Sequence, residues 1–296
     1  MTISSVSIVI PTHDGGATVG PLLDAIARQR IDIPVEIVVV DSSSTDGSDA
    51  MLRRRADVFI SVRPDAFNHG LTRNLGISRS RGDAVVLTVQ DAVPDADDWL
   101  SNLVAPLGAD DRIAGAFARQ IPRPHASPLA RRHLERWVAA STTPRTTTLS
   151  GIDEFNALTP LQRLDRCAFD NVCACVRRSV WQRHPFRDVP IAEDLAWAKE
   201  VLLAGHRIAF VPDAVVVHSH DRPSQYEFDR TRLLHGELYR LFGLQTIRSL
   251  PALASSIAAT IAEHARLEPG VRGFQLAVAW PLGQYLGARA AARAKM

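Results

Sequence analysis

The chain has 296 residues, of which 46% are hydrophobic and 22% are charged, the composition of a globular protein with room for one large domain or two smaller ones. A formal net charge of +2 is too close to neutral to indicate a nucleic-acid partner. No apolar run reaches the ~20 residues of a membrane-spanning helix, and the N-terminus lacks the basic and apolar regions of a signal peptide.

Short apolar runs alternate with helical patterns along the N-terminal third of the chain. The apolar runs are rich in β-branched residues and predict buried strands over residues 6–10, 35–40, 57–62 and 84–89. Apolar residues at helical spacing lie between them, over residues 19–28, 46–55 and 71–78. Strands that are apolar along their whole length and alternate with helices predict an α/β fold, with a mainly parallel sheet covered on both faces.

The second half of the chain is less regular. Residues 122–164 are rich in Pro, Thr and Arg, and we expect a long mobile loop there. A helix that begins at Glu193 and stops at Gly205 is followed by a strand, a turn and a second strand. The chain from Tyr226 onward is predicted to be mostly helical. We expect the three cysteines to be reduced thiols in a cytosolic protein, because their number is odd and their spacing does not fit a zinc site.

Polar residues follow the predicted strands, where ligands bind to parallel sheets. Thr12 and Asp14 follow the first strand, Asp41 and Ser43 the second, and Asp91 the fourth. The loop "PTHDGGATVG" after the first strand lacks the glycine pattern of a dinucleotide site and the Gly-Lys-Ser/Thr of a P-loop. A dehydrogenase or a kinase is therefore not indicated.

Three segments together resemble the family-two inverting glycosyltransferases, whose catalytic domain has the GT-A fold. They read "SIVIPTHDGG", "EIVVVDSSSTDGS" and "FNHGLTRNLGISRSRGD". The resemblance covers roughly residues 4–225, which implies a GT-A domain over residues 1–225 and a helical extension over residues 226–296. The segments "AFNHGLTRNLG" and "VQDAVP" look like the bacterial rhamnosyltransferases of O-antigen and surface-polysaccharide synthesis. That likeness implies dTDP-L-rhamnose as the donor.

The resemblance assigns a donor-binding role to residues around the strand ends. Asp41 would recognise the nucleotide base together with the main chain at Pro11 and Thr12. The simpler interpretation of Asp41 is a turn-forming residue. Arg73 would shape the donor pocket or serve as a structural arginine, and Asn68 would face the donor or cap a helix. The remaining predicted donor-binding residues are Asp14, Ser43, His69 and Gln90.

Asp91 takes the place of the second Asp in the family's Asp-x-Asp metal motif, and Val89 takes the place of the first. The resemblance implies a divalent metal, Mg²⁺ or Mn²⁺, bound by Asp91 with help from His218. Phosphate and water can complete the shell of such an ion, so one carboxylate can suffice. His220 and Asp221 are close enough in sequence to compete with His218. The alternatives are a strand-end Asp91 that caps the helix at Trp99, and a surface loop histidine.

Glu193 and Asp194 open a helix at the position of the family's catalytic Glu-Asp pair. Inverting transfer requires a general base that takes a proton from the acceptor hydroxyl. We expect Asp194 to be this base, with Glu193 as the second choice. A carboxylate at a helix N-terminus also has a purely structural explanation, because it interacts favourably with the helix dipole.

The implied partners are a nucleotide-diphospho-sugar donor and a saccharide or lipid-linked acceptor, at the cytoplasmic face of the cell membrane. Residues 274–296 suit an amphipathic helix on anionic lipid, or a helix packed on the protein. Three alternatives stay open: a donor that is a UDP- or GDP-sugar, a nucleotidyltransferase, and a non-catalytic homologue that binds nucleotide sugar. Val89 and Ser42 favour the last of these, whereas the loop after the first strand lacks the basic residue expected of a nucleotidyltransferase.

Overall fold

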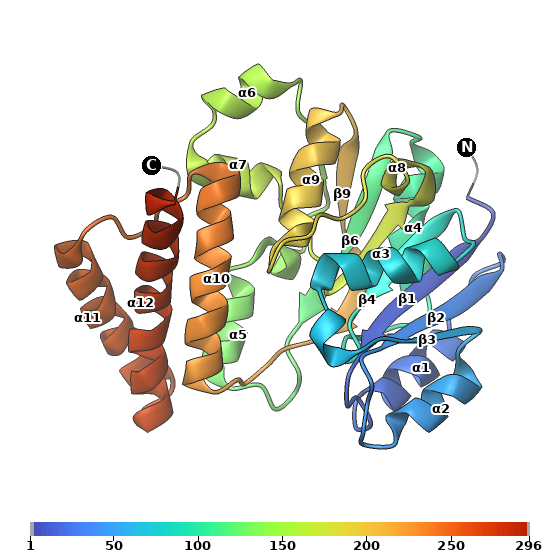
Figure 1. Ribbon diagram of the computed structural model, residues 1–296, viewed down its shortest axis with the longest axis horizontal. Coiled ribbons are helices and arrows are strands. Elements are labelled where there is room, and N and C mark those ends of the chain that lie inside the picture. The colour runs from blue at the N-terminus through green and yellow to red at the C-terminus, as the bar shows by residue number, and fades with distance from the viewer. Residues whose placement is uncertain (1–2, 295–296) are drawn as a thin grey trace.

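The computed structural model describes residues 3–294 (Figure 1). Its strands form one mixed sheet in the order β3-β2-β1-β4-β8-β6-β9-β5, with β7 paired to β9. The strands are β1 (Val6–Thr12), β2 (Val35–Asp41), β3 (Val58–Ser61), β4 (Ala84–Thr88), β5 (Val93–Pro94), β6 (Ile113–Ile121), β7 (Arg145–Thr147), β8 (Cys173–Arg177) and β9 (Arg207–Val217). The four strands predicted in the N-terminal third are thus confirmed.

The strand directions bring the ends of several strands to one edge of the sheet. β1 pairs in parallel with β2 and β4, β2 with β3, and β6 with β9, whereas β8 is antiparallel to both β4 and β6. The carboxyl ends of β1, β2, β4, β6 and β9 and the amino end of β8 therefore lie at the same edge. We call this the site edge. It carries the residues that follow Thr12, Asp41, Thr88, Ile121 and Val217 and those that precede Cys173.

Both faces of the sheet are covered, as predicted. Side chains alternate along β1: Ile8 and Ile10 pack with α1 (Val19–Ala27), α2 (Ser48–Arg55) and α4 (Trp99–Ala109) on one face. Val9 packs with α3 (His69–Arg79) and α9 (Glu193–Leu203) on the other. Each fully buried aliphatic side chain of these two layers contributes about 1.5–3 kcal/mol relative to exposure to water. The core thus holds the strand ends of the site edge in place.

The prediction of a long loop over residues 122–164 is wrong. This segment contains α5 (Pro128–Glu135), α6 (Ile152–Ala157), α7 (Pro160–Arg166), β7 and a 3-10 turn at Val138–Ala140. Prolines that suggested a loop occupy the first turn of α5 and α7, where a missing N–H costs nothing. Ser127 caps α5, and Thr159 forms a capping box with Gln162 at α7.

The prediction of two strands separated by a turn before His218 is also wrong. β9 is one strand of 11 residues. Its pairing with β6 shifts register between the Ala118–Val211 and Arg119–Val215 pairs, so that Pro212 lies in a bulge. Three other short elements are η1 (Pro64–Ala66), η2 (Val138–Ala140) and α8 (Arg178–Trp181).

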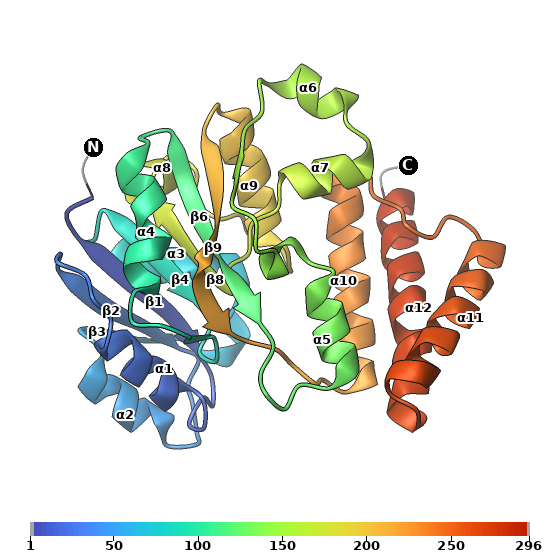
Figure 2. The ribbon, with the colours of Figure 1, turned by 180° about the vertical axis from the view of Figure 1, so that it is seen from behind.

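The predicted helical C-terminal part consists of α10 (Ser224–Phe242), α11 (Leu250–Leu267) and α12 (Val271–Arg293). These helices stand on the opposite side of the molecule from β1–β3 in both views (Figures 1 and 2). Glycines let α10 and α12 pack closely, because a Cβ at Gly287 would lie 2.1 Å from the carbonyl oxygen of Arg232. Leu238 and Phe242 join α10 to the main core. Among the described residues, no helix combines the length and the apolar character needed to span a membrane.

Candidate active site

The loops after β1 and β2 are bound to each other by hydrogen bonds. The hydroxyl of Thr12 donates to Oδ1 of Asp41 (2.9 Å), and the backbone N–H of Ser44 donates to Oδ2 (2.9 Å). The hydroxyl of Ser44 also donates to Oδ1. Asp41 is only 1% exposed, so its carboxylate forms the turn that the simpler interpretation proposed. A donor base would contact this turn rather than a free carboxylate.

Gln90 connects the end of β4 to the loop after β1. Its Oε1 accepts from the backbone N–H of His13 (2.8 Å), and its Nε2 donates to the backbone oxygen of the same residue (3.0 Å). Asp14 has a φ of 44° and accepts from the N–H of Thr45 at 2.7 Å. A Cβ at Gly15 would lie 2.8 Å from Oε1 of Gln90, so a larger residue there would displace the end of the Gln90 side chain. We call residues 12–16, 41–46 and Gln90 the donor wall.

The predicted donor residues farther along the chain have structural partners. Ser43 donates its hydroxyl to the backbone oxygen of Val62 (2.8 Å). Asn68 caps α3 by accepting from the N–H groups of Gly70 and Leu71, as one interpretation predicted. His69 is exposed in the first turn of α3. Asn68 and Ser43 therefore shape the backbone at the site edge, and only His69 presents a side chain to solvent.

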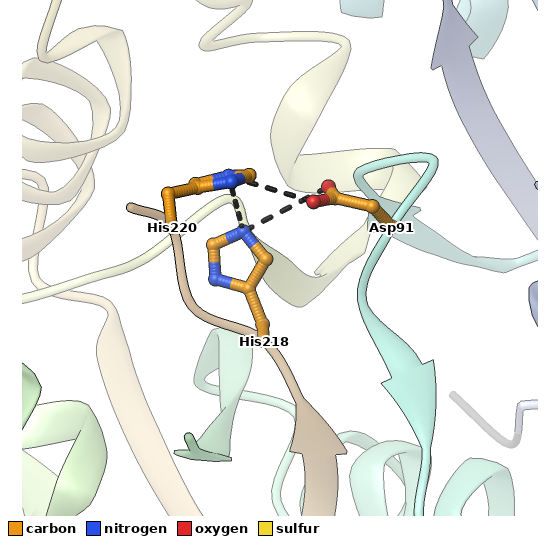
Figure 3. A group of neighbouring side chains, drawn as sticks. All are labelled: Asp91, His218 and His220. Carbon is orange, nitrogen blue, oxygen red and sulfur yellow. Dashed lines mark hydrogen bonds and ion pairs between the residues drawn. The ribbon is translucent and has the colours of Figure 1, made fainter. Parts of the chain in front are cut away.

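Asp91, His218 and His220 form a compact group at the site edge (Figure 3). Each offers one ligand atom, and these three atoms lie within 4.8 Å of one another. Nε2 of His218 lies 3.8 Å from Oδ1 of Asp91, and Nε2 of His220 lies 3.5 Å from Oδ2. The two Nε2 atoms are 3.0 Å apart. One carboxylate and two imidazoles, all aimed at one point, fit a divalent cation.

Electrostatics keep these imidazoles in the form that binds metal. Burial, together with the cationic side chains of Arg123 and Arg222, lowers the pKa of His218 to about 4, although Asp91 acts in the opposite direction. Burial also lowers the pKa of His220. Both rings are therefore neutral at physiological pH, which leaves a lone pair on each ring for coordination.

Arg123, which follows β6, shares the carboxylate of Asp91. Its Nη2 donates to Oδ2 of Asp91 at 2.7 Å and to the backbone oxygen of Asp91 at 3.0 Å. The alternative that Asp91 caps the helix at Trp99 is not supported, because residue 98 is the N-cap of α4. The guanidinium of Arg123 therefore lies beside the carboxylate that could hold a metal ion.

The adjacent carboxylates of Glu193 and Asp194 have different environments at the start of α9. Glu193 is 5% exposed, and its Oε1 accepts from Arg73 Nη1 at 2.9 Å and from Asn171 Nδ2 at 3.2 Å. Arg73, also buried, donates to the backbone oxygens of His69 and Asn171. Arg73 is thus the buried partner of Glu193, which agrees with its structural interpretation.

Among residues 3–294, no cationic side chain forms an ion pair with Asp194, whose carboxylate accepts from the N–H groups of Leu195 (2.8 Å) and Asn171 (3.3 Å). Burial, followed by the charges of Glu193 and Asp170, raises the pKa of Asp194 to about 8. Ala192, two residues before Asp194, has a φ of 64°, a left-handed conformation that costs a non-glycine residue about 1–2 kcal/mol. Backbone strain two residues from a carboxyl group with a raised pKa is typical of a functional site.

The sequence profile described as "Glycosyl transferase family 2" matches residues 7–178, which is more than half of the chain. The chain belongs to this family. Over 230 residues it is 30% identical to the O-antigen chain rhamnosyltransferase RfbN of Salmonella typhimurium, with 76% of this chain and 69% of that protein covered. It is also 30% identical to the O-antigen chain rhamnosyltransferase WbaN of Salmonella anatum, with coverages of 76% and 70%. The protein is therefore a glycosyltransferase.

Solved structures confirm the GT-A fold of this transferase. The mannosyltransferase PcManGT of Pyrobaculum calidifontis, in complex with GDP-Man and Mn²⁺, aligns with a TM-score of 0.62 at 22% identity, covering 100% of this chain and 89% of that one. The glucosyl-3-phosphoglycerate synthase of Mycobacterium tuberculosis, in complex with Mn²⁺ and UDP, aligns with a TM-score of 0.58 at 18% identity, covering 81% and 80%. At these identities the likeness extends to the fold alone.

The structure adds residues of the transferase that were not among the predicted ligands. His220 was considered only as a competitor of His218, yet both imidazoles approach Asp91. Arg123 lies in the segment expected to be a loop, two residues after the end of β6. A basic residue close behind a buried strand is the signal that could have identified it. We call Asp91, His218, His220 and Asp194 the catalytic wall.

Proposed function

We propose that the protein is an inverting, metal-dependent rhamnosyltransferase that takes L-rhamnose from dTDP-L-rhamnose. The observation that carries the proposal is a combination at one sheet edge. Asp194 forms no ion pair with a cationic side chain in the described part of the chain, and the Asp91–His218–His220 group lies at the same edge. The first suits a general base and the second suits a diphosphate-binding cation. The 30% identity to two O-antigen rhamnosyltransferases supports rhamnose as the transferred sugar.

The chemistry is a single displacement. The oxygen of the acceptor hydroxyl attacks C1 of the sugar while the bond between C1 and the diphosphate oxygen breaks. The hydroxyl proton passes to the Asp194 carboxylate, and the bonding electron pair leaves with the nucleoside diphosphate. Attack from the face opposite the leaving group inverts the configuration at C1.

The pKa of Asp194 suits this step. A base with a pKa near the operating pH combines a usable fraction of the ionised form with a strong affinity for the proton. Burial and two neighbouring carboxylates raise the pKa to about 8. Glu193 cannot serve as readily, because Arg73 and Asn171 occupy its Oε1 atom. Its role is to hold the start of α9 and thereby to position Asp194.

Asp91, His218 and His220 would hold the divalent metal, which supplies positive charge to the diphosphate leaving group when bound. Two imidazole ligands favour Mn²⁺ over Mg²⁺, since Mg²⁺ prefers oxygen ligands. Mn²⁺ is also the ion present in the complexes of the mannosyltransferase and the synthase named above. Arg123, which contacts Asp91, lies where it can contact the same phosphates.

The donor is tested with a panel of dTDP-rhamnose, UDP-glucose, UDP-galactose and GDP-mannose, each with Mn²⁺ or with EDTA. A ligand that binds only the folded state raises the melting temperature. We expect a Mn²⁺-dependent rise with dTDP-rhamnose that is lost in Asp91→Ala. The matched control is Asp221→Ala, which removes a neighbouring carboxylate that bonds to Ser127 and Arg272 instead. A shift with another donor only would keep the transferase class and contradict rhamnose.

Analysis of the products distinguishes the proposed function from two others. A non-catalytic homologue would show the thermal shift without release of dTDP in the presence of any saccharide acceptor. A nucleotidyltransferase would consume a nucleoside triphosphate and a sugar phosphate. Release of dTDP that depends on an acceptor, with an inverted anomeric configuration by NMR, is the result expected here.

The acceptor is proposed to be a saccharide or a lipid-linked saccharide, reached from the membrane surface. Val271 and Phe274, at the start of α12, are 75% and 57% exposed, and the exposed Arg266 is close in sequence. Apolar side chains beside basic ones suit an anionic lipid surface. Flotation with vesicles that contain anionic lipid tests this contact. Co-flotation that is lost in Phe274→Ser would support it, and no co-flotation would exclude it.

A further inference from the structure

A chain of side chains connects Trp137 to His218 beneath the metal-binding group. Trp137 Nε1 donates to Oδ2 of Asp170 at 2.7 Å, and Nε2 of Gln120 donates to the same oxygen at 2.7 Å. Oε1 of Gln120 lies 3.0 Å from Nδ1 of His218. Gln120 and His218 are 4% and 8% exposed, so this chain is shielded from water.

Trp137 and Gln120 both donate to one oxygen of Asp170, and with Asp170 ionised every hydrogen bond in this chain has one direction. An indole N–H can only donate, so Oδ2 of Asp170 is an acceptor. Oδ1 of Asp170 accepts from the backbone N–H of Val172 at 2.9 Å, which leaves the carboxylate with acceptor contacts only. Gln120 therefore turns its NH₂ group toward Asp170 and its carbonyl oxygen toward His218. A carbonyl oxygen has no hydrogen, so Nδ1 of His218 must donate.

A neutral imidazole has one N–H and one lone pair. If the proton is on Nδ1, the lone pair is on Nε2, and this atom faces Oδ1 of Asp91 and Nε2 of His220. The opposite tautomer would place an N–H at the metal position and a lone pair against the carbonyl oxygen of Gln120. Ligand histidines in proteins are commonly oriented through their second nitrogen in this way.

We propose that Asp170 and Gln120 are positioning residues that fix the tautomer and ring orientation of His218, so that Nε2 is ready to bind the divalent metal. Trp137 supports them by fixing the direction of the hydrogen bonds. The turn of residues 170–172 thereby serves both parts of the catalytic wall, because the N–H of Asn171 also donates to Asp194. This inference rests on the proposed metal dependence.

The first test measures the tautomer of His218 in the metal-free protein, by long-range ¹H–¹⁵N correlation NMR of ¹⁵N-histidine-labelled protein. We expect the Nδ1–H form in the unaltered protein. In Gln120→Met, which keeps the length of the side chain and removes its carbonyl, we expect a mixture with the Nε2–H form. Finding the Nε2–H form in the unaltered protein would overturn the inference.

The second test measures Mn²⁺ affinity by titration followed by electron paramagnetic resonance. Loss of a group that orients a metal ligand typically weakens metal binding 10–100-fold, and we expect a loss in this range for Gln120→Met. The matched control is Gln29→Met. Gln29 forms hydrogen bonds to the backbone of Ala25, Ala96 and Leu100 and none to the metal-binding group. Unchanged Mn²⁺ affinity in a folded Gln120→Met variant would overturn the inference.

A second, milder variant tests the same inference if Gln120→Met does not fold. Trp137→Phe leaves Gln120 in place and removes one donor to Asp170, so a smaller loss of Mn²⁺ affinity is expected. Trp181→Phe, which removes an indole hydrogen bond to Asn74, is the control, and we expect its Mn²⁺ affinity to be unchanged. Failure of the unaltered protein to bind Mn²⁺ would overturn this inference together with the metal dependence. Normal metal results without any sugar transfer would count against the proposed function alone.

Discussion

The donor wall and the catalytic wall face the same sheet edge but are stabilised in opposite ways. In the donor wall, hydroxyl and amide groups satisfy the carboxylates, and hydrogen bonds from Ser48 and Gly16 lower the pKa of Asp46. In the catalytic wall, burial raises the pKa of Asp194 and lowers that of His218. A binding surface can be built from groups that stabilise one another, whereas a general base needs a pKa high enough to take up a proton.

The largest expected effect is that of Asp194→Asn. The amide keeps an acceptor oxygen for the N–H of Leu195 but cannot take a proton, so we expect kcat to fall about 10³-fold with little change in the KM for the donor. A loss of less than tenfold would exclude Asp194 as the base.

The same variant should be more stable than the unaltered protein. The folded state raises the pKa of Asp194 from 3.8 to about 8, so the native form binds this proton more tightly than the unfolded chain does. Folding stability therefore decreases as the pH rises from about 4 to about 8, and the change to Asn removes this decrease. We expect a higher melting temperature for Asp194→Asn at pH 8, and a lower one would contradict the raised pKa.

Glu193→Gln should lose stability and keep most of its activity, which is the reverse of the effects expected for Asp194→Asn. Arg73 is 4% exposed and would lose its charged partner, and breaking a buried ion pair from one side typically costs about 3–5 kcal/mol. We expect the free energy of unfolding in urea to fall by about 3 kcal/mol, with residual kcat far above that of Asp194→Asn. A larger loss of kcat in Glu193→Gln than in Asp194→Asn, with unchanged stability, would assign the proton transfer to Glu193.

The strand-end rule predicted much of the site from the sequence. Asp41, Asp91 and His218 each follow an apolar strand, and parallel strands end at a common edge. Their partners could not be predicted, because Gln120 meets His218 through the pairing of β6 with β9, which is a property of register rather than of local sequence. The ranking of Asp194 before Glu193 as the base stays a prediction. The pairing of Glu193 with Arg73 spans 120 residues and could be seen only in the fold.

The pH dependence of transfer should follow the ionisation of Asp194. With a pKa of about 8, roughly a tenth of the carboxyl groups are ionised at pH 7 and most are at pH 9. We expect kcat to rise about tenfold between these pH values at saturating donor, acceptor and Mn²⁺. In Glu193→Gln the rise should move to lower pH, because the charge of Glu193 is one cause of the raised pKa of Asp194. A flat profile from pH 6 to pH 9 would contradict this assignment of the base.

The smallest expected effect tests the rigidity of the donor wall through Gly15→Ala. A Cβ at this position would lie 2.8 Å from Oε1 of Gln90, so Gln90 must move and lose its two hydrogen bonds to the backbone of His13. Each such bond contributes about 0.5–1.5 kcal/mol, and we expect the free energy of unfolding to fall by about 1 kcal/mol and the KM for the donor to rise several-fold, with kcat nearly unchanged. Gly108→Ala in α4 is the matched control, because a Cβ there meets no atom within 4 Å, and alanine in a helix is about as stable as glycine or more so. If Gly15→Ala behaves like Gly108→Ala, the hydrogen bonds of Gln90 do not set the shape of the donor wall. The donor wall and the catalytic wall would then differ only in the environment of their carboxyl groups.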